Sequence, residues 1–138
     1  MPHLRQLPTL TLAAAKAIAA AAEAFAVERG WPVAIAVVDA AGGLMYFQLL
    51  DDTQPGSQDV ALHKARTAAR FKRPTKALED AVAGGRQALL SLPGVTAVEG
   101  GVPIEVGGRV VGAVGVSGMQ SSQDSQVAVA GIAAFRPD

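Results

Sequence analysis

The chain contains no cysteine. Disulfide bonds, thiolate metal sites and cysteine nucleophiles are therefore excluded. Long apolar runs are also missing, because Lys16 and Glu23 interrupt the most apolar segment, residues 11–27. No stretch reaches the roughly 18 to 20 uninterrupted apolar residues of a membrane span, and no basic region directly precedes this segment, as it would in a signal peptide. We therefore expect a soluble, cytoplasmic protein that does not bind membranes.

The chain also lacks an excess of charge of either sign, because twelve basic residues balance twelve acidic ones. This balance argues against a general nucleic-acid or membrane-surface binder, which would carry a basic excess. Charged residues make up 17% of the chain, less than the usual quarter, and much of the apolar half is alanine. Such a composition favours a protomer that hides surface in a homo-oligomer, from a dimer to an octamer. A monomer with long alanine-rich helices is the alternative.

A single domain over residues 1–138 suits a chain of this length. Apolar residues at helical spacing and their flanking cap residues Thr11, Thr75 and Ser122 predict helices over residues 11–29, 57–72, 76–83 and 121–135, with a further turn over 86–92. Apolar and β-branched runs predict strands at 33–39, 44–50, 95–98, 102–106 and 109–118. Hairpins in this order indicate an α+β domain, in which helices pack on the faces of a central antiparallel sheet of about five strands.

Several familiar motifs are absent. There is no HExxH motif, EF-hand loop or carboxylate cluster, so a structural metal is not expected. The glycines of "GAVGVSG" lie inside a strand rather than at a strand-to-helix turn, which argues against a dinucleotide site, and Ser117 is not in a GxSxG context. Met1-Pro2 is reminiscent of the N-terminal proline base of small tautomerases, but those enzymes begin a strand at that residue, whereas this segment leads into a helix.

The segment "DVALHKARTAARF", residues 59–71, reads as a helix with two different faces. One is a smooth apolar strip that can pack on the sheet, made of Ala61, Leu62, Ala65, Ala68 and Ala69. Beside it lies a mixed face made of Val60, His63, Lys64, Thr67 and Phe71. A mixed face suits a partly buried pocket or a subunit interface, although a solvated helix flank would look the same. We expect a ligand or another subunit, and not the chain's own core, to cover this face.

The residue types on the mixed face have definite chemical capacities. The imidazole of His63 can ligate a metal or haem iron, or transfer protons. Lys64 can pair with an anionic group such as a propionate. Thr67 can donate to the carbonyl four residues earlier or to a ligand.

Four segments together resemble the GlcG/HbpS family of haem-binding proteins, also found as the C-terminal domain of PduO. They are "LTLAAAKAIAAAAEAFA…PVAIAVVDAAGGL", "ALHKARTAARFKRPT", "LPGVTAVEGGVPIEVGGRVVGAVGVSG" and "SSQDSQVAVAGIAA", and they cover almost the whole chain. The positions that match the family pattern are Asp39, Lys64, Ala65, Thr67, Ala68, Gly101, Pro103, Gly115, Ser117, Gly118 and Asp124. His63 is not among its fixed positions, and Met119-Gln120 replaces the small residue and proline that more often follow "GVSG". The resemblance implies a profilin-like fold, higher oligomers and, for some members, haem binding.

The leading hypothesis is a haem-binding protein that sequesters or degrades haem. His63 would be the metal ligand, Lys64 and Arg66 would hold the propionates, and Thr67 would line the site. Apolar walls would come from Phe71, Met45 and Phe47.

Two other hypotheses stay open. One is a cofactor-independent isomerase, tautomerase or hydratase that acts on a small oxo-acid, with Asp39 or His63 as the base. In that enzyme, substrate-binding groups would come from Lys64, Gly101, Pro103 and Ser117. The other is a non-catalytic accessory subunit of a catabolic system, in which the mixed face is simply buried at an oligomer contact.

Overall fold

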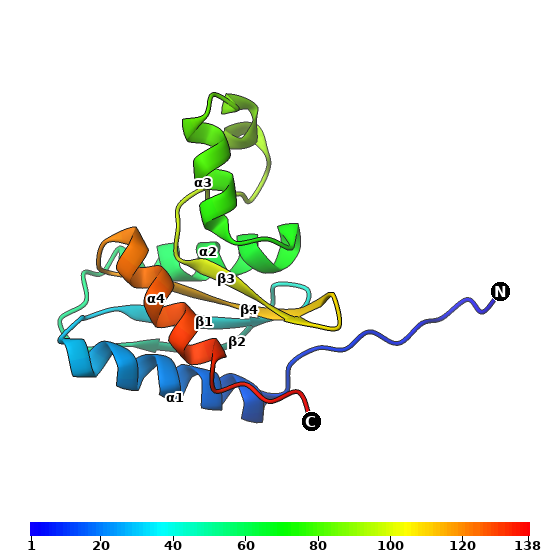
Figure 1. Ribbon diagram of the computed structural model, residues 1–138, viewed down its shortest axis with the longest axis horizontal. Helices are drawn as coiled ribbons and strands as arrows, with labels where there is room; N and C mark the ends of the chain where they lie inside the picture. The colour runs from blue at the N-terminus through cyan, green and yellow to red at the C-terminus, as the bar shows by residue number, and fades with distance from the viewer.

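The computed structural model describes residues 1–138 and consists of four α-helices, one short 3-10 helix and four strands (Figure 1). In chain order these are α1 (Leu12–Arg29), β1 (Ala34–Asp39), β2 (Leu44–Leu49), α2 (Ser57–Phe71), α3 (Thr75–Ala83), η1 (Gln87–Ser91), β3 (Gly101–Val106), β4 (Arg109–Ser117) and α4 (Ser121–Ile132). The expected α+β class is confirmed. None of the helices is both long enough and apolar enough to cross a membrane.

The sheet has four strands in the order β2-β1-β4-β3, and every neighbouring pair is antiparallel. The expectation of about five strands is therefore wrong, because residues 95–98 do not join the sheet. The backbone of this segment bonds to a helix instead: the N–H of Thr96 donates to Oγ1 of Thr67 at 3.0 Å. A side-chain acceptor on α2 thus takes the place of a neighbouring strand.

Helices cover both faces of the sheet, with α1 and α4 on one side and α2 on the other (Figure 1). The core under α1 and α4 is built from larger side chains, including Ile18, Ile35, Val37, Val114 and Val127. The core under α2 is almost entirely alanine: Ala34, Ala36, Ala61, Ala65, Ala68, Ala69 and Ala113 surround a single valine, Val38. Small side chains on both surfaces let α2 lie very close to the strands.

Gly115 of β4 permits this close approach. A Cβ atom at Gly115 would collide with the backbone of Ala61 and Ala65 on α2. The helix backbone therefore rests directly on the strand backbone at this point. The sequence alone places Lys64 and Thr67 beside the core, on the flank of α2. The close approach brings them against β4 and the loop before β3.

The helix ends agree with the sequence in part. The hydroxyl of Thr11 accepts a hydrogen bond from the N–H of Ala14 at 3.1 Å, and Gly30 ends α1 with φ +70°, as the N-cap and stop signals predict. Thr75, expected as a cap, is instead the buried first residue of α3, and its Oγ1 accepts from the N–H of Gly101 at 2.9 Å. In α4 the cap is Gln120 and not Ser122.

Candidate functional site

Lys64 points from α2 into the interior and forms a buried ion pair. Its Nζ lies 3.2 Å from Oδ2 of Asp124 at the start of α4, and both side chains are 2% exposed. The same Nζ donates to the carbonyl of Val116 on β4 at 2.9 Å. The ammonium thus has both of its hydrogen-bond partners inside the protomer, where it ties α2 to α4 and β4.

The Asp124 carboxyl carries its charge in a dry setting. Burial raises the pKa of this group above its usual value, while the hydrogen bond from the N–H of Met119 and the charge of Lys64 act to lower the pKa. The Met119 N–H lies 2.9 Å from Oδ1. The effect of desolvation on the pKa is larger than the opposite effect of these partners. Burying the charged pair therefore costs free energy, and the pair is stable only when both charges have their partners.

Thr67 is also buried and bonded within the chain. Its Oγ1 donates to the carbonyl of His63 at 2.7 Å and accepts from the N–H of Thr96 at 3.0 Å. The carbonyl of Gly94 lies 3.3 Å from the same oxygen. The expectation that a ligand or another subunit covers the mixed face is therefore wrong for Lys64 and Thr67, because the chain's own loop and α4 cover them.

His63 differs from these two neighbours because it is exposed on the outer side of α2. Arg66 and Arg70 follow it at three and seven residues, so the three side chains share that outer side. Nε of Arg66 donates to the carbonyl of Gly42 at 3.2 Å, and Nε of Arg70 donates to the carbonyl of Ala41 at 3.0 Å. Neither guanidinium is in an ion pair. We call His63, Arg66 and Arg70 the basic ridge.

Arg70 was missed by the sequence reasoning, which stopped at Arg66. The signal was present, since Arg70 lies four residues after Arg66 on the same side of a helix. Asp59 lies on this side too, one turn before His63, so an acidic residue precedes the basic ridge along the helix. The two bonds to the β1–β2 turn hold the arginine side chains in place.

The expected apolar walls are only partly brought together. Phe47 of β2 and Leu62 of α2 pack against the alanine core on the α2 side. Met45 packs instead against the larger core on the opposite face of the sheet. Phe71 is half-buried at the last turn of α2. Leu62 precedes Arg66 by one turn and is thus an apolar neighbour of the basic ridge, whereas Phe47 is placed only against the alanine core and Met45 lies on the opposite face.

The residues expected to act on an oxo-acid are engaged in the fold. Oδ1 of Asp39 accepts from the N–H groups of Ala41 and Gly43 at 2.9 and 2.8 Å, which shapes the β1–β2 turn. Ser117 is buried and donates to the hydroxyl of Ser57 at 3.2 Å.

Gly101 and Pro103 belong to β3 and pair with β4. Together with Asp39, Lys64 and Ser117, they are absent from the walls of the three main cavities. The structure therefore does not gather these side chains around one open site.

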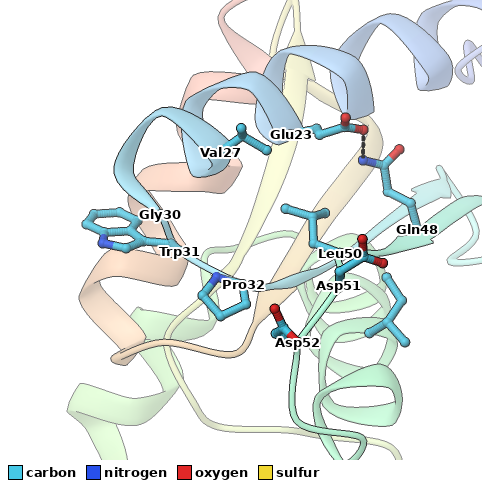
Figure 2. A pocket seen from close by; sticks show the side chains of 10 residues that line it. Glu23, Val27, Gly30, Trp31, Pro32, Gln48, Leu50, Asp51 and Asp52 are labelled. Atoms are coloured by element: carbon cyan, nitrogen blue, oxygen red, sulfur yellow. Dashed lines mark hydrogen bonds between the residues drawn. The ribbon is translucent and has the colours of Figure 1, made fainter.

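An open cleft lies elsewhere, between the C-terminal half of α1 and the end of β2 (Figure 2). This α1–β2 cleft has a volume of about 570 Å³ and is lined by Glu23, Val27, Gly30, Trp31, Pro32, Gln48, Leu49, Leu50, Asp51 and Asp52. It contains three carboxylates and no basic side chain, and Oε1 of Glu23 accepts from Nε2 of Gln48 at 2.6 Å. Sequence reasoning missed the cleft because its residues come from two segments with no shared local pattern.

Comparison with known proteins identifies relatives of the whole chain. The model of a family described as haem degrading protein HbpS-like matches residues 10–133. Protein GlcG of Escherichia coli strain K12 is 45% identical over 103 residues, which are 75% of this chain and 77% of GlcG. The crystal structure of a double mutant of Streptomyces reticuli HbpS superposes with a TM-score of 0.90 at 36% identity, covering 96% of this chain and 91% of that one. A crystal structure of a PduOC–haem complex superposes with a TM-score of 0.84 at 28% identity, covering 94% and 97%.

Proposed function

This chain belongs to the HbpS-like family of haem degrading proteins, and from that premise we propose that it binds haem on the outer side of α2. The basic ridge carries this proposal. It presents an exposed imidazole, followed along the helix by two guanidiniums that no carboxylate neutralises. His63 would hold the iron, and Arg66 and Arg70 would hold the propionates. The bound group would supply a redox-active iron, which is the chemistry that haem breakdown requires.

The ridge fits the three chemical features of haem. Neutral imidazole is a common iron ligand, and guanidinium groups bind carboxylates through paired hydrogen bonds. At about 1.5 Å rise per residue, Arg66 and Arg70 lie about 4.5 and 10.5 Å along the helix axis from His63. A guanidinium is therefore available at two distances from the imidazole that would hold the iron. Leu62, one turn before Arg66 on α2, would provide apolar contact beside the ridge.

The α1–β2 cleft does not fit haem, although it is a cavity of about 570 Å³ and the basic ridge is an open helix surface. It holds no histidine, and its three carboxylates would repel two propionates. The structure thus favours the helix surface over the cleft on electrostatic grounds.

The buried residues of α2 take supporting roles in this proposal. Lys64 is paired with Asp124, so the propionate role passes to Arg66 and Arg70. Thr67 bonds to the main-chain carbonyl of His63 and to the N–H of Thr96, so it would fix the loop before β3 without touching haem. Met45 is not part of the apolar wall, because it lies on the other face of the sheet.

The proposed site is open, and self-association would cover it. A single helix side contacts only one side of a flat macrocycle, whereas bound ligands are usually enclosed on most of their surface. Leu44 and Leu49 on the edge strand β2 are 46% and 42% exposed, which supports contact with another copy. We therefore include a homo-oligomer in the proposal.

Hemin titration followed by the Soret band tests this function. The chain has two histidines, so His3→Ala is a matched control for His63→Ala. We expect saturable, stoichiometric binding in the wild type and in His3→Ala. In His63→Ala we expect an altered Soret position and about tenfold weaker binding, since one coordination bond is lost. Unchanged binding in His63→Ala, or an unsaturable response of the wild type like that of a non-specific carrier, would contradict the proposal.

A further inference from the structure

The N-terminal segment, residues 1–9, forms an arm that leaves the body of the protein at the start of α1 (Figure 1). Every residue of the arm is exposed, including Leu4 at 89% and Leu7 at 57%. Its charged side chain is Arg5, joined by His3, and no acidic residue occurs before Glu23. Prolines near both ends of the arm favour an extended chain in the residues that precede them. The arm is thus an extended basic segment with unburied leucines.

The α1–β2 cleft has the complementary properties. Asp51 and Asp52 are exposed and in no ion pair, and Figure 2 shows Asp52 beside Pro32 at the far end of α1. Its apolar wall includes Val27 at 62% and Leu49 at 42% exposed. The cleft also adjoins β2, an edge strand whose outer side has no partner, and such an edge readily receives an extended segment.

We propose that the arm of one copy docks in the α1–β2 cleft of a second copy. Leu4 and Leu7 cover the apolar wall, and Arg5 faces Asp51 and Asp52. This inference rests on the self-association included in the proposed function, but it is independent of haem, because the basic ridge lies on α2. The arm is basic and the cleft is acidic, so the cleft should bind the arm in preference to an anionic ligand.

Arg5 cannot reach Asp52 in the cleft of its own chain. Thr9 is fixed to the body, because its Oγ1 accepts from the N–H of Ala40 at 3.0 Å, and the next residue, Leu10, donates to the carbonyl of Val111 at 3.1 Å. The Cα of Arg5 is four residues from Thr9 and lies at most about 14 Å from it, so the guanidinium reaches at most about 21 Å. The cleft begins at Glu23, about 16 Å along α1 from Leu12, but Asp52 lies beside Pro32, beyond the C-terminal end of the helix (Figure 2), and the 18 residues of α1 span about 27 Å. The contact must therefore join two copies.

Charge reversal provides the first test, measured by sedimentation velocity at low ionic strength. We expect Arg5→Glu to raise the dissociation constant for self-association by about tenfold or more. Combining it with Asp51→Lys and Asp52→Lys should restore most of the affinity. Arg109→Glu is the matched control, because this exposed arginine is also in no ion pair. A monomeric wild type, or an Arg5→Glu variant that behaves like the control, would overturn the inference.

Cysteine cross-linking provides the second test, since the chain has no cysteine of its own. A tagged Arg5→Cys protein is mixed with an untagged Asp51→Cys protein under mild oxidation. We expect a disulfide-linked heterodimer in several-fold greater yield than with Lys76→Cys, which lies on exposed α3. Equal yields would overturn the docking even if the protein is oligomeric, and a hemin titration of the same variants reports separately on the haem proposal.

Discussion

Nζ of Lys64 lies 3.2 Å from Oδ2 of Asp124, and each of the two side chains is 2% exposed. The residues are 60 positions apart in sequence, so the pair closes a long loop between α2 and α4. A charge in such a place persists only with its partner, because an unpaired buried ion is strongly destabilising. Lys64 and Asp124 both match positions of the family pattern. Their buried ion pair gives each of them a structural role in the fold.

Breaking this pair should be costly. We expect Asp124→Ala to lower the free energy of unfolding by about 3–5 kcal/mol, because the buried Lys64 ammonium and the Met119 N–H both lose a hydrogen-bond acceptor. Asp80→Ala, which breaks the exposed pair between Lys76 and Asp80, should cost less than about 1 kcal/mol. Urea unfolding measures both values. If Asp124→Ala is too unstable to purify, the apolar double variant Lys64→Met with Asp124→Leu should recover a folded protein, and failure of the double variant would count against this account.

The pair should also give stability a characteristic dependence on pH. Burial raises the pKa of Asp124 in the folded protein above its usual value, so between those two pKa values the folded state binds more protons than the unfolded state. The stability contributed by this group is therefore complete below its ordinary pKa and declines as pH rises through the folded pKa. The difference in unfolding free energy between the wild type and Asp124→Asn should fall as pH rises from about 4 towards neutrality. A difference that grows with pH would contradict the assignment.

The contact between α2 and β4 should tolerate no side chain at Gly115. A Cβ there meets the backbone of Ala61 and Ala65, and relief requires moving the whole helix. We expect Gly115→Ala to destabilise the protein by about 1–3 kcal/mol. Gly56→Ala is the matched control, because nothing lies within 4 Å of its Cβ position and its φ is −60°; it should be neutral or slightly stabilising. Thermal unfolding of the two variants distinguishes these outcomes.

The hydroxyl of Thr67 should hold the loop before β3 in place. Thr67→Val removes the acceptor of the Thr96 N–H and should cost about 1–3 kcal/mol. Amide hydrogen exchange at Thr96 should accelerate more than exchange in β4. Thr67→Ser keeps the oxygen and should retain slow exchange. Equal protection of Thr96 in the valine and serine variants would show that packing, and not the hydrogen bond, fixes this loop.

The arginines of the basic ridge should determine the affinity for the haem propionates. Replacing Arg66 and Arg70 together by alanine should weaken hemin binding by about tenfold or more, since two charge-assisted contacts are lost. The same replacement of Arg86 and Arg109, which lie outside the ridge, should leave affinity unchanged. Titration of both double variants at two salt concentrations should show that only the ridge variant loses the salt dependence. Equal affinity of the two would remove the arginines from the site.

Local patterns in the sequence predicted most of the fold. Period and cap residues located α1 from Thr11 to Gly30, and Gly107-Gly108, with φ values of +56° and +78°, form the expected turn between β3 and β4. The number of strands was overestimated because residues 95–98 have β-branched side chains, while their backbone partner, Thr67, lies far away in sequence. Local propensity cannot identify such a partner.

The candidate site was predicted less completely than the fold. The sequence named His63 and Arg66 as candidates and grouped Lys64 with them, although the structure buries Lys64 and leaves His63 exposed. The burial of Lys64 depends on the close approach that Gly115 allows and on Asp124 at the start of α4. Both are long-range features, so the distinction between a ligand-binding lysine and an internal ion pair required the three-dimensional structure.

The central claim is that His63 holds haem iron, and histidine-selective NMR tests it most directly. With two histidines in the chain, protein labelled with ¹⁵N and ¹³C in histidine gives two sets of imidazole signals, which His3→Ala assigns. On addition of one equivalent of ferric hemin, the account predicts that the His63 signals shift or broaden out of the diamagnetic range while those of His3 stay in place. Unmoved His63 signals in a sample whose Soret band shows bound hemin would contradict it.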